Sequence, residues 1–117
     1  MIHTNHISEW FSSTHLEALN HLSKLRIHLG SQTVLLKDHQ TQDLVDLFKF
    51  LATHHVKPYY LHHPDQVKGA MHFYLSLKEG IKIYQELRQL LPGWAIPHYV
   101  QDSPTENQKR LVSTITN

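Results

Sequence analysis

The sequence predicts an α/β fold in which parallel strands are joined by crossover helices. Segments with helical spacing of apolar residues alternate with short strand-like segments. The connections between successive strands are roughly 20 to 40 residues long, as right-handed βαβ units require. The chain has 117 residues, 40% of them hydrophobic, so it can bury one core. We expect about four strands and three helices.

The first half of the chain contains two predicted helices and a strand. The first helix is expected near Ser13, because Thr14 and Glu17 have capping-box spacing. Its apolar residues recur at steps near three, at Leu16, Leu19, Leu22 and Leu25. A short strand follows at residues 33–36. Thr41 can cap the second helix. The apolar face of that helix consists of Leu44, Val45, Leu47, Phe48 and Leu51.

The second half repeats the alternation. Residues 56–61 have the pattern of a strand with Pro58 near its start, and residues 62–75 that of a loop. Ser76 and Glu79 again have capping-box spacing. They open an amphipathic helix with Leu77, Ile81, Tyr84, Leu87 and Leu91 on its apolar face. Pro92 and Gly93 end it, residues 94–100 are extended, and the polar residues 101–117 lack strong periodicity.

Charge and composition exclude several classes of protein. The 11 Lys and Arg residues nearly balance the 10 Asp and Glu residues, so no nucleic acid or membrane partner is expected. No apolar run approaches the ~18 residues of a membrane span. The first residues lack the charged and apolar regions of a signal peptide, so a cytoplasmic location is expected. The absence of cysteine excludes disulfides and Cys-ligated zinc or iron–sulfur clusters within the chain.

Titratable residues recur where the predicted strands end. Ligand-binding loops of parallel α/β folds lie at the carboxyl ends of the strands. The candidates there are His3, His6, Asp38, His39, His62, His63, Asp65 and Asp102.

The 12 histidines raise the question of a metal site. His54–His55 and His62–His63 are adjacent pairs, but no pair has the helical spacing of a zinc site. We therefore expect scattered, solvent-facing imidazoles and no metal. The aromatic residues of the predicted strands are expected to pack in the core: Tyr59, Tyr60, Trp94 and Tyr99.

Four segments carry a set of motifs. Their sequences are PYYLHHPDQVKGAMHF at residues 58–73, GSQTVLL at 30–36, IHTNH at 2–6 and LPGWAIP at 91–97. In order and spacing they resemble the PYYLH–D–V-x-G-A-x-HF, NQTVLL, THxNH and LPGYLVP segments of the lysine 2,3-aminomutase family. The resemblance is closer to the branch that isomerises lysine for elongation factor P modification than to the catabolic branch.

The resemblance implies a fold and a chemistry. The fold is the C-terminal half of a radical SAM type partial (β/α) barrel, with the half-barrel at residues 1–100 and a tail at 101–117. Intact family members are isomerases that convert L-lysine to β-lysine. A [4Fe–4S] cluster on a CxxxCxxC loop cleaves S-adenosylmethionine to a 5′-deoxyadenosyl radical, and pyridoxal phosphate (PLP) holds the migrating nitrogen.

The resemblance also implies roles for five residues. Lys109, seven residues after Asp102, matches the lysine that binds PLP. Asp65 and Asp102 match the acidic pair that holds the remote ammonium of the substrate. His3 and Gln32 match positions that face S-adenosylmethionine. From the residues alone, Lys109 can also be a solvated tail lysine, and both aspartates can be turn residues.

The chain departs from the family pattern. It lacks the cluster cysteines, Ile7 replaces a proline, and residues 105–108 replace a glycine-rich run before the PLP lysine. We therefore expect a fragment or truncated member that is inactive alone. It would bind lysine or a similar small molecule and associate with a missing N-terminal half or with itself. The alternative is a non-catalytic remnant that acts as a lysine- or PLP-binding or protein-interaction module.

Overall fold

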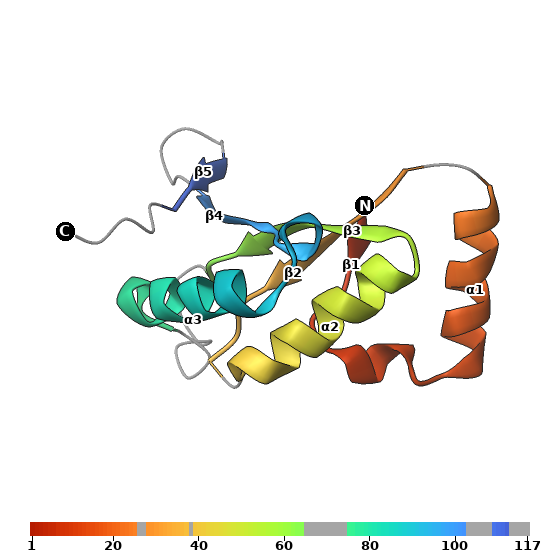
Figure 1. Cartoon of the computed structure of the whole chain (residues 1–117), viewed down its shortest axis with the longest axis horizontal. Coiled ribbons are helices and arrows are strands. Elements are labelled where there is room, and N and C mark those ends of the chain that lie inside the picture. The colour runs from red at the N-terminus through yellow and green to blue at the C-terminus, as the bar shows by residue number, and fades with distance from the viewer. Residues whose placement is uncertain (26–27, 38, 65–74, 103–108, 113–117) are drawn as a thin grey trace.

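The computed structural model describes residues 1–25, 28–37, 39–64, 75–102 and 109–112. Within them a five-stranded sheet has the order β1-β2-β3-β4-β5 (Figure 1). The strands are β1 (Ile2–His3), β2 (Leu29–Val34), β3 (Val56–His62), β4 (His98–Asp102) and β5 (Lys109–Leu111). Strands β1 to β4 are parallel, and β5 is antiparallel to β4. The predicted α/β fold with four parallel strands is confirmed.

Helices connect these strands. They are the 3-10 helix η1 (Ile7–Trp10), the α-helices α1 (Ser13–Lys24), α2 (Thr41–Thr53) and α3 (Leu77–Leu90), and the 3-10 helix η3 (Gly93–Ala95). Helices α2 and α3 pack against each other and, with the strands, enclose the core. Burial alternates along β2 and β3, so one face of the sheet is covered and the other is more exposed.

Helix α2 presents the apolar face that its sequence predicts. Its five predicted core residues are all at most 3% exposed. They pack in one cluster with Val56 and Leu61 of β3, and burying each such side chain contributes about 1.5–3 kcal/mol. The helix begins differently from the prediction, because Gln40 is the N-cap and Thr41 the first helical residue. The Thr41 hydroxyl instead donates a hydrogen bond to the Glu86 carboxylate of α3.

Fewer leucines of helix α1 are buried than their helical spacing predicts. Leu19 is buried, but Leu22 is 36% and Leu25 54% exposed. The reason is that α1 contacts mainly the short η1, so it has no second helix to cover a broad apolar stripe. The predicted cap was also wrong: Ser12 is the N-cap and Thr14 is already helical.

The aromatic residues of the strands do not all enter the core. Tyr99 is 1% exposed, whereas Tyr59 is 39% and Trp94 63% exposed, so the core prediction was wrong for these two. Ser31 of β2 pairs with Pro58 and Gln32 pairs with Tyr60, which leaves Tyr59 as an extra residue. Proline has no N–H for the ladder, so a bulge after it is physically expected. Trp94 lies in η3 rather than in a strand.

The end of the chain contributes to the sheet. Residues 109–111, expected in an aperiodic polar tail, form β5 and pair with β4. The Val112 N–H also donates to the Tyr99 carbonyl, at 2.8 Å. A three-residue strand is too short for its periodicity to be recognised in the sequence.

Candidate functional site

The carboxyl ends of the parallel strands meet at one edge of the sheet. Strand pairing aligns His3 with Gln32, Val34 with His62, and His62 with Val100. A pocket of about 250 Å³ opens there, lined by His3, Asn5, Gln32, His62, His63 and Pro64. Of the residues expected at this edge, His3, His62 and His63 are therefore brought together.

Gln32 and His62 both line this pocket and contact each other. The His62 ring Nε2 lies 3.0 Å from the Gln32 side-chain oxygen, so the imidazole donates and the amide accepts. His3, the register partner of Gln32, is exposed beside them. A ligand at this edge meets an imidazole, an amide and backbone groups, which suit a polar molecule.

Asn5 holds the loop after β1 against the end of β2. Its side-chain oxygen accepts the Val34 N–H at 2.9 Å. Its carbonyl accepts a hydrogen bond from His39 Nε2 at 2.7 Å, while His39 Nδ1 accepts the Leu36 N–H at 2.9 Å. His39 therefore has its proton on Nε2. His39, expected at the ligand edge, instead supports the backbone of two loops.

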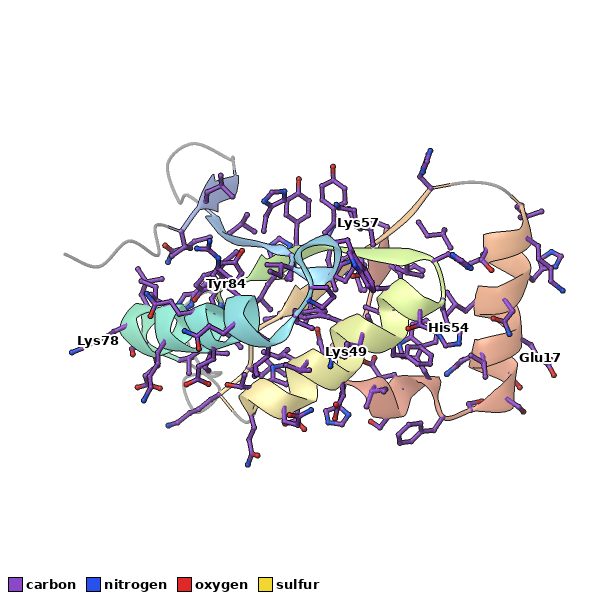
Figure 2. All side chains as sticks on the ribbon, viewed as in Figure 1. Glu17, Lys49, His54, Lys57, Lys78 and Tyr84 are labelled. Atoms are coloured by element: carbon purple, nitrogen blue, oxygen red, sulfur yellow. The ribbon has the colours of Figure 1, made fainter. Side chains whose placement is uncertain are left out.

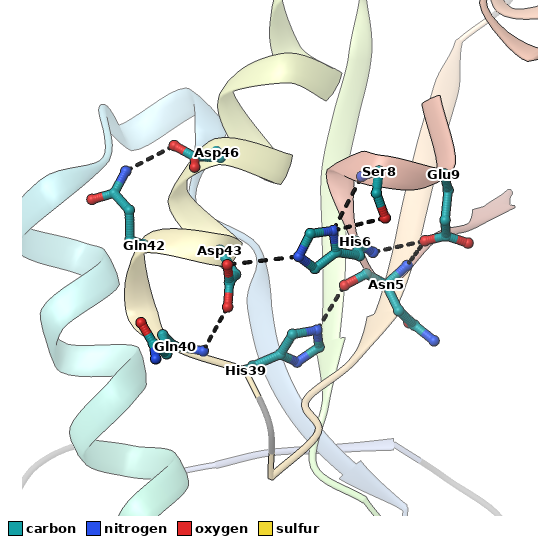
Figure 3. A network of polar contacts seen from close by, with 9 residues as sticks. All are labelled: Asn5, His6, Ser8, Glu9, His39, Gln40, Gln42, Asp43 and Asp46. Carbon is teal, nitrogen blue, oxygen red and sulfur yellow. Dashed lines mark hydrogen bonds and ion pairs between the residues drawn. The ribbon is translucent and has the colours of Figure 1, made fainter. Parts of the chain in front are cut away.

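The Glu9 carboxylate organises the same loop from the other side (Figure 3). One oxygen accepts the N–H groups of Asn5 at 2.6 Å and His6 at 2.7 Å, and the Thr4 hydroxyl at 3.0 Å. Burial raises the pKa of Glu9, but the hydrogen bonds from His6, Asn5 and Thr4 outweigh it and lower the pKa below its usual value. The carboxylate thus stabilises the turn that follows β1.

His6 belongs to this network rather than to the pocket. Its Nε2 lies 3.6 Å from an Asp43 oxygen at the start of α2 (Figure 3). Its Nδ1 accepts the Ser8 N–H at 3.1 Å. The predicted edge residue His6 therefore joins the β1 loop to α2.

A buried tyrosine fixes the end of β3. The Tyr99 hydroxyl lies 2.7 Å from His63 Nδ1, and both side chains are at most 3% exposed. They pack on Gly80 of α3, where a Cβ would come within 2.0 Å of the hydroxyl. His63 is consequently held by the core at the wall of the pocket.

The last two strands bring two predicted residues together. In the β4–β5 ladder, Asp102 is the direct register partner of Lys109. The two residues are seven positions apart in the sequence, and they lie opposite each other in the β4–β5 ladder. Asp65 and Asp38 lie outside the described residues.

Relatives of known name decide the family. No protein-family model matches the chain. A putative L-lysine 2,3-aminomutase of Aquifex aeolicus is 38% identical over 104 residues, which cover 87% of this chain and 27% of that protein. The L-lysine 2,3-aminomutase of Escherichia coli is 36% identical over 109 residues, 92% of this chain and 32% of that protein. The chain is a homologue of the lysine 2,3-aminomutases.

The similarity includes more than one named activity. A glutamate 2,3-aminomutase of Clostridioides difficile is 36% identical over 104 residues, 87% of this chain and 24% of that protein. The chain thus spans about a quarter to a third of the length of the curated aminomutases it matches. The family resemblance seen in the motifs is confirmed.

The edge also contains residues to which the family resemblance assigned no ligand role, although His62 was named among the titratable residues at the strand ends. Asn5 and His62 line the pocket beside His3 and Gln32. Both lie inside the family-like motifs, at residues 2–6 and 58–73, so the motifs contained a signal for them. The contact between His62 and Gln32 joins positions 30 residues apart, and pattern alone does not reveal it.

Two other features bear on this aminomutase homologue. Among the described residues, no group of three or more His, Asp or Glu side chains is arranged to hold a metal ion. In that same part of the chain, no helix combines the length and apolar character needed to cross a membrane.

Proposed function

We propose that the chain forms the substrate half of an aminomutase and does not catalyse isomerisation alone. It would be the C-terminal half of a radical SAM type partial barrel. The observation that carries the proposal is the register of family-matched residues at the carboxyl edge of the sheet. His3 pairs with Gln32 there, and Asp102 with Lys109. Relatives named L-lysine 2,3-aminomutase support lysine as the substrate.

The residues present do not fit an iron–sulfur cluster. Such clusters are held by cysteine thiolates, and this sequence has no cysteine. We therefore assign no step of radical formation to this chain. In the proposal, a different polypeptide segment supplies the cluster, and His3 and Gln32 contact S-adenosylmethionine from the substrate side.

Lys109 fits the role of the PLP lysine better than that of a free tail residue. Its backbone is paired into β5, opposite an aspartate of β4. Bound PLP would carry the migrating amino nitrogen of the substrate. Lys109 would hold the cofactor, and Asp65 and Asp102 would bind the remote ammonium of lysine by charge-assisted hydrogen bonds.

The β1 side of the molecule supports docking of the missing half. β1 is an edge strand of the described sheet, so it has hydrogen-bonding groups to offer. Beside it, a largely apolar groove of about 340 Å³ is lined by residues that include Ile2, Trp10, Leu19 and Leu22. A strand and helix of another segment would cover both.

Lysine binding tests the substrate assignment. L-lysine is titrated into the PLP-saturated chain by calorimetry, with norleucine, which lacks the remote ammonium, as the matched ligand. We expect lysine to bind at least about fivefold more tightly, and Asp102→Asn to remove the difference. Equal binding of the two ligands would contradict the proposal.

Radical formation is tested separately. The chain is incubated with S-adenosylmethionine, reductant, PLP and lysine, with the Escherichia coli relative as positive control. We expect neither 5′-deoxyadenosine nor β-lysine from the chain. 5′-Deoxyadenosine above a no-protein control would contradict the proposal that the chain forms no radical alone.

The lack of cysteine also favours a second candidate, a lysine- or PLP-binding module without catalysis. The adjacent coding sequence separates the two. A neighbouring reading frame that encodes CxxxCxxC and stops before a THxNH segment supports a split enzyme. Its absence supports the module.

A further inference from the structure

The edge of the sheet at which the parallel strands begin lies opposite the pocket of His3, Gln32 and His62, and it has fewer acidic residues nearby. The segments that lead into β2, β3 and β4, residues 24–30, 52–59 and 91–98, contain no Asp or Glu. The segments that follow the strands contain Glu9, Asp43 and Asp65 among other acids. Acid-free surfaces with several cations attract anions.

Two adjoining pockets open at this edge. One, of about 410 Å³, is lined by residues that include His28, His55, Lys57 and Trp94. The other, also of about 410 Å³, shares His28 and Lys57 and adds Tyr59. Among the described residues, neither pocket has an acidic lining side chain. The shared lining makes Lys57 the cation common to both.

The lining residues are presented to solvent. His28, His55 and Lys57 are exposed, and the Trp94 indole is 63% exposed. The Lys57 ammonium lies 6.0 Å from the centroid of the Tyr59 ring, which is within the range of a cation–π interaction. This interaction favours a position of the lysine side chain above Tyr59 of the same strand. An exposed indole that lines the same pocket as Lys57 offers a flat surface for a planar ring.

His55 is held in a backbone conformation that disfavours it. Its φ is 65°, in the left-handed region, directly after the C-cap His54 of α2. Glycine is the usual residue at this position of a helix end, because a side chain there is strained. Such strain is concentrated at functional sites. At this pocket the chain has an exposed imidazole at a position where glycine would be less strained.

We propose that this edge binds a phosphorylated ligand of mononucleotide size. The phosphate contacts Lys57, His28 and His55, and the ring stacks on Trp94. Lysine is a point-charge binder of phosphate, and two imidazoles add further donors. Base stacking on an aromatic side chain tolerates different bases, so the site recognises the class and not one nucleotide. This site is separate from the aminomutase site and does not depend on it.

Adenosine 5′-monophosphate is the probe. It is titrated into the full 117-residue chain at low salt by calorimetry, and the indole N–H signal of Trp94 is followed by NMR. Ribose 5-phosphate and adenosine are the two half-ligands. We expect the monophosphate to bind at least about fivefold more tightly than either, to shift the Trp94 signal, and to weaken as salt rises. Absence of binding, or equal binding of ribose 5-phosphate, overturns the proposal.

Three variants make the test independent of folding. Lys57→Gln should weaken binding about fivefold, and Lys49→Gln, an exposed lysine of α2 that lines neither pocket, should not (Figure 2). His55→Gly should raise the melting temperature, because it relieves the left-handed strain, yet weaken binding about threefold. Equal effects of the two lysine variants, or unchanged binding by His55→Gly, would overturn the assignment of these residues.

Discussion

At Gly80 of α3, adding a single methyl group by substitution with alanine should strongly destabilise the fold. A Cβ at Gly80 would lie 2.0 Å from the Tyr99 hydroxyl and 3.1 Å from His63 Nδ1. Tyr99 and His63 are almost fully buried, so neither can move into solvent. The Tyr99 ring also packs on Tyr84, with centroids 5.2 Å apart, which blocks a sideways shift. Gly80→Ala must therefore displace the tyrosine or the helix.

The magnitude follows from three contributions. Overpacking a filled core costs about 1–3 kcal/mol, and disrupting the buried hydrogen bond between His63 and Tyr99 costs about 1–3 kcal/mol. Alanine recovers about 1 kcal/mol in a helix relative to glycine. The expected net loss is about 1–5 kcal/mol in the free energy of unfolding, compared with the ~5–15 kcal/mol typical of a domain.

Urea unfolding followed by circular dichroism measures this loss. Gly93→Ala is the matched control, because nothing lies within 4 Å of a Cβ there, and it should change stability by less than about 0.5 kcal/mol. Tyr99→Phe removes the clashing oxygen, so the double variant should be less destabilised than the sum of the single variants. Equal stability of Gly80→Ala and Gly93→Ala would refute the packing argument.

Further predictions concern single side chains and assembly. Glu9→Gln should cost about 1 kcal/mol at pH 7, discounted for solvent exposure. Because the folded pKa of Glu9 is lowered, this contribution is present above the unfolded pKa and is lost as pH falls through the folded pKa, which urea unfolding between pH 7 and 3 measures. Tyr84→Phe loses the hydrogen bond to the Pro97 carbonyl and should cost about 1 kcal/mol by urea unfolding. Burial raises the Tyr84 pKa, so this stability is present below the unfolded pKa and is lost as pH rises through the folded one, seen in the phenolate absorbance. Leu61→Ala should cost about 3 kcal/mol in the same unfolding assay. Sedimentation at tens of micromolar should show self-association, and a sharp monomer would count against the open β1 edge.

Local sequence patterns predicted the elements in which apolar residues recur with the period of the element itself, every three or four residues in a helix. The apolar face of α2 is an example, because its five apolar side chains can all be buried together only if the segment is a helix with that face toward the core. The cap of α3 is another, since the Ser76 hydroxyl accepts the Glu79 N–H at 3.2 Å. Strand order placed His3 at the carboxyl edge because parallel strands end together, and strand pairing then brings it opposite Gln32 of β2.

What the sequence could not predict depends on contacts distant along the chain. The leucine stripe of α1 looks like that of α2, but no second helix covers it, so Leu25 stays exposed. The bulge at Tyr59 depends on how β3 pairs with β2. His39 resembles a ligand residue in sequence, but its ring hydrogen-bonds to backbone groups of Leu36 and of Asn5, the latter 34 residues away.

The site of PLP attachment tests the proposed substrate half most directly. The chain is incubated with PLP, reduced with borohydride, digested and mapped by mass spectrometry. We expect a larger modified fraction at Lys109 than at the exposed Lys24 and Lys78, and we expect Lys109→Ala to remove this excess while the circular dichroism spectrum stays unchanged. An equal or smaller modified fraction at Lys109 would show that this lysine is not a PLP site.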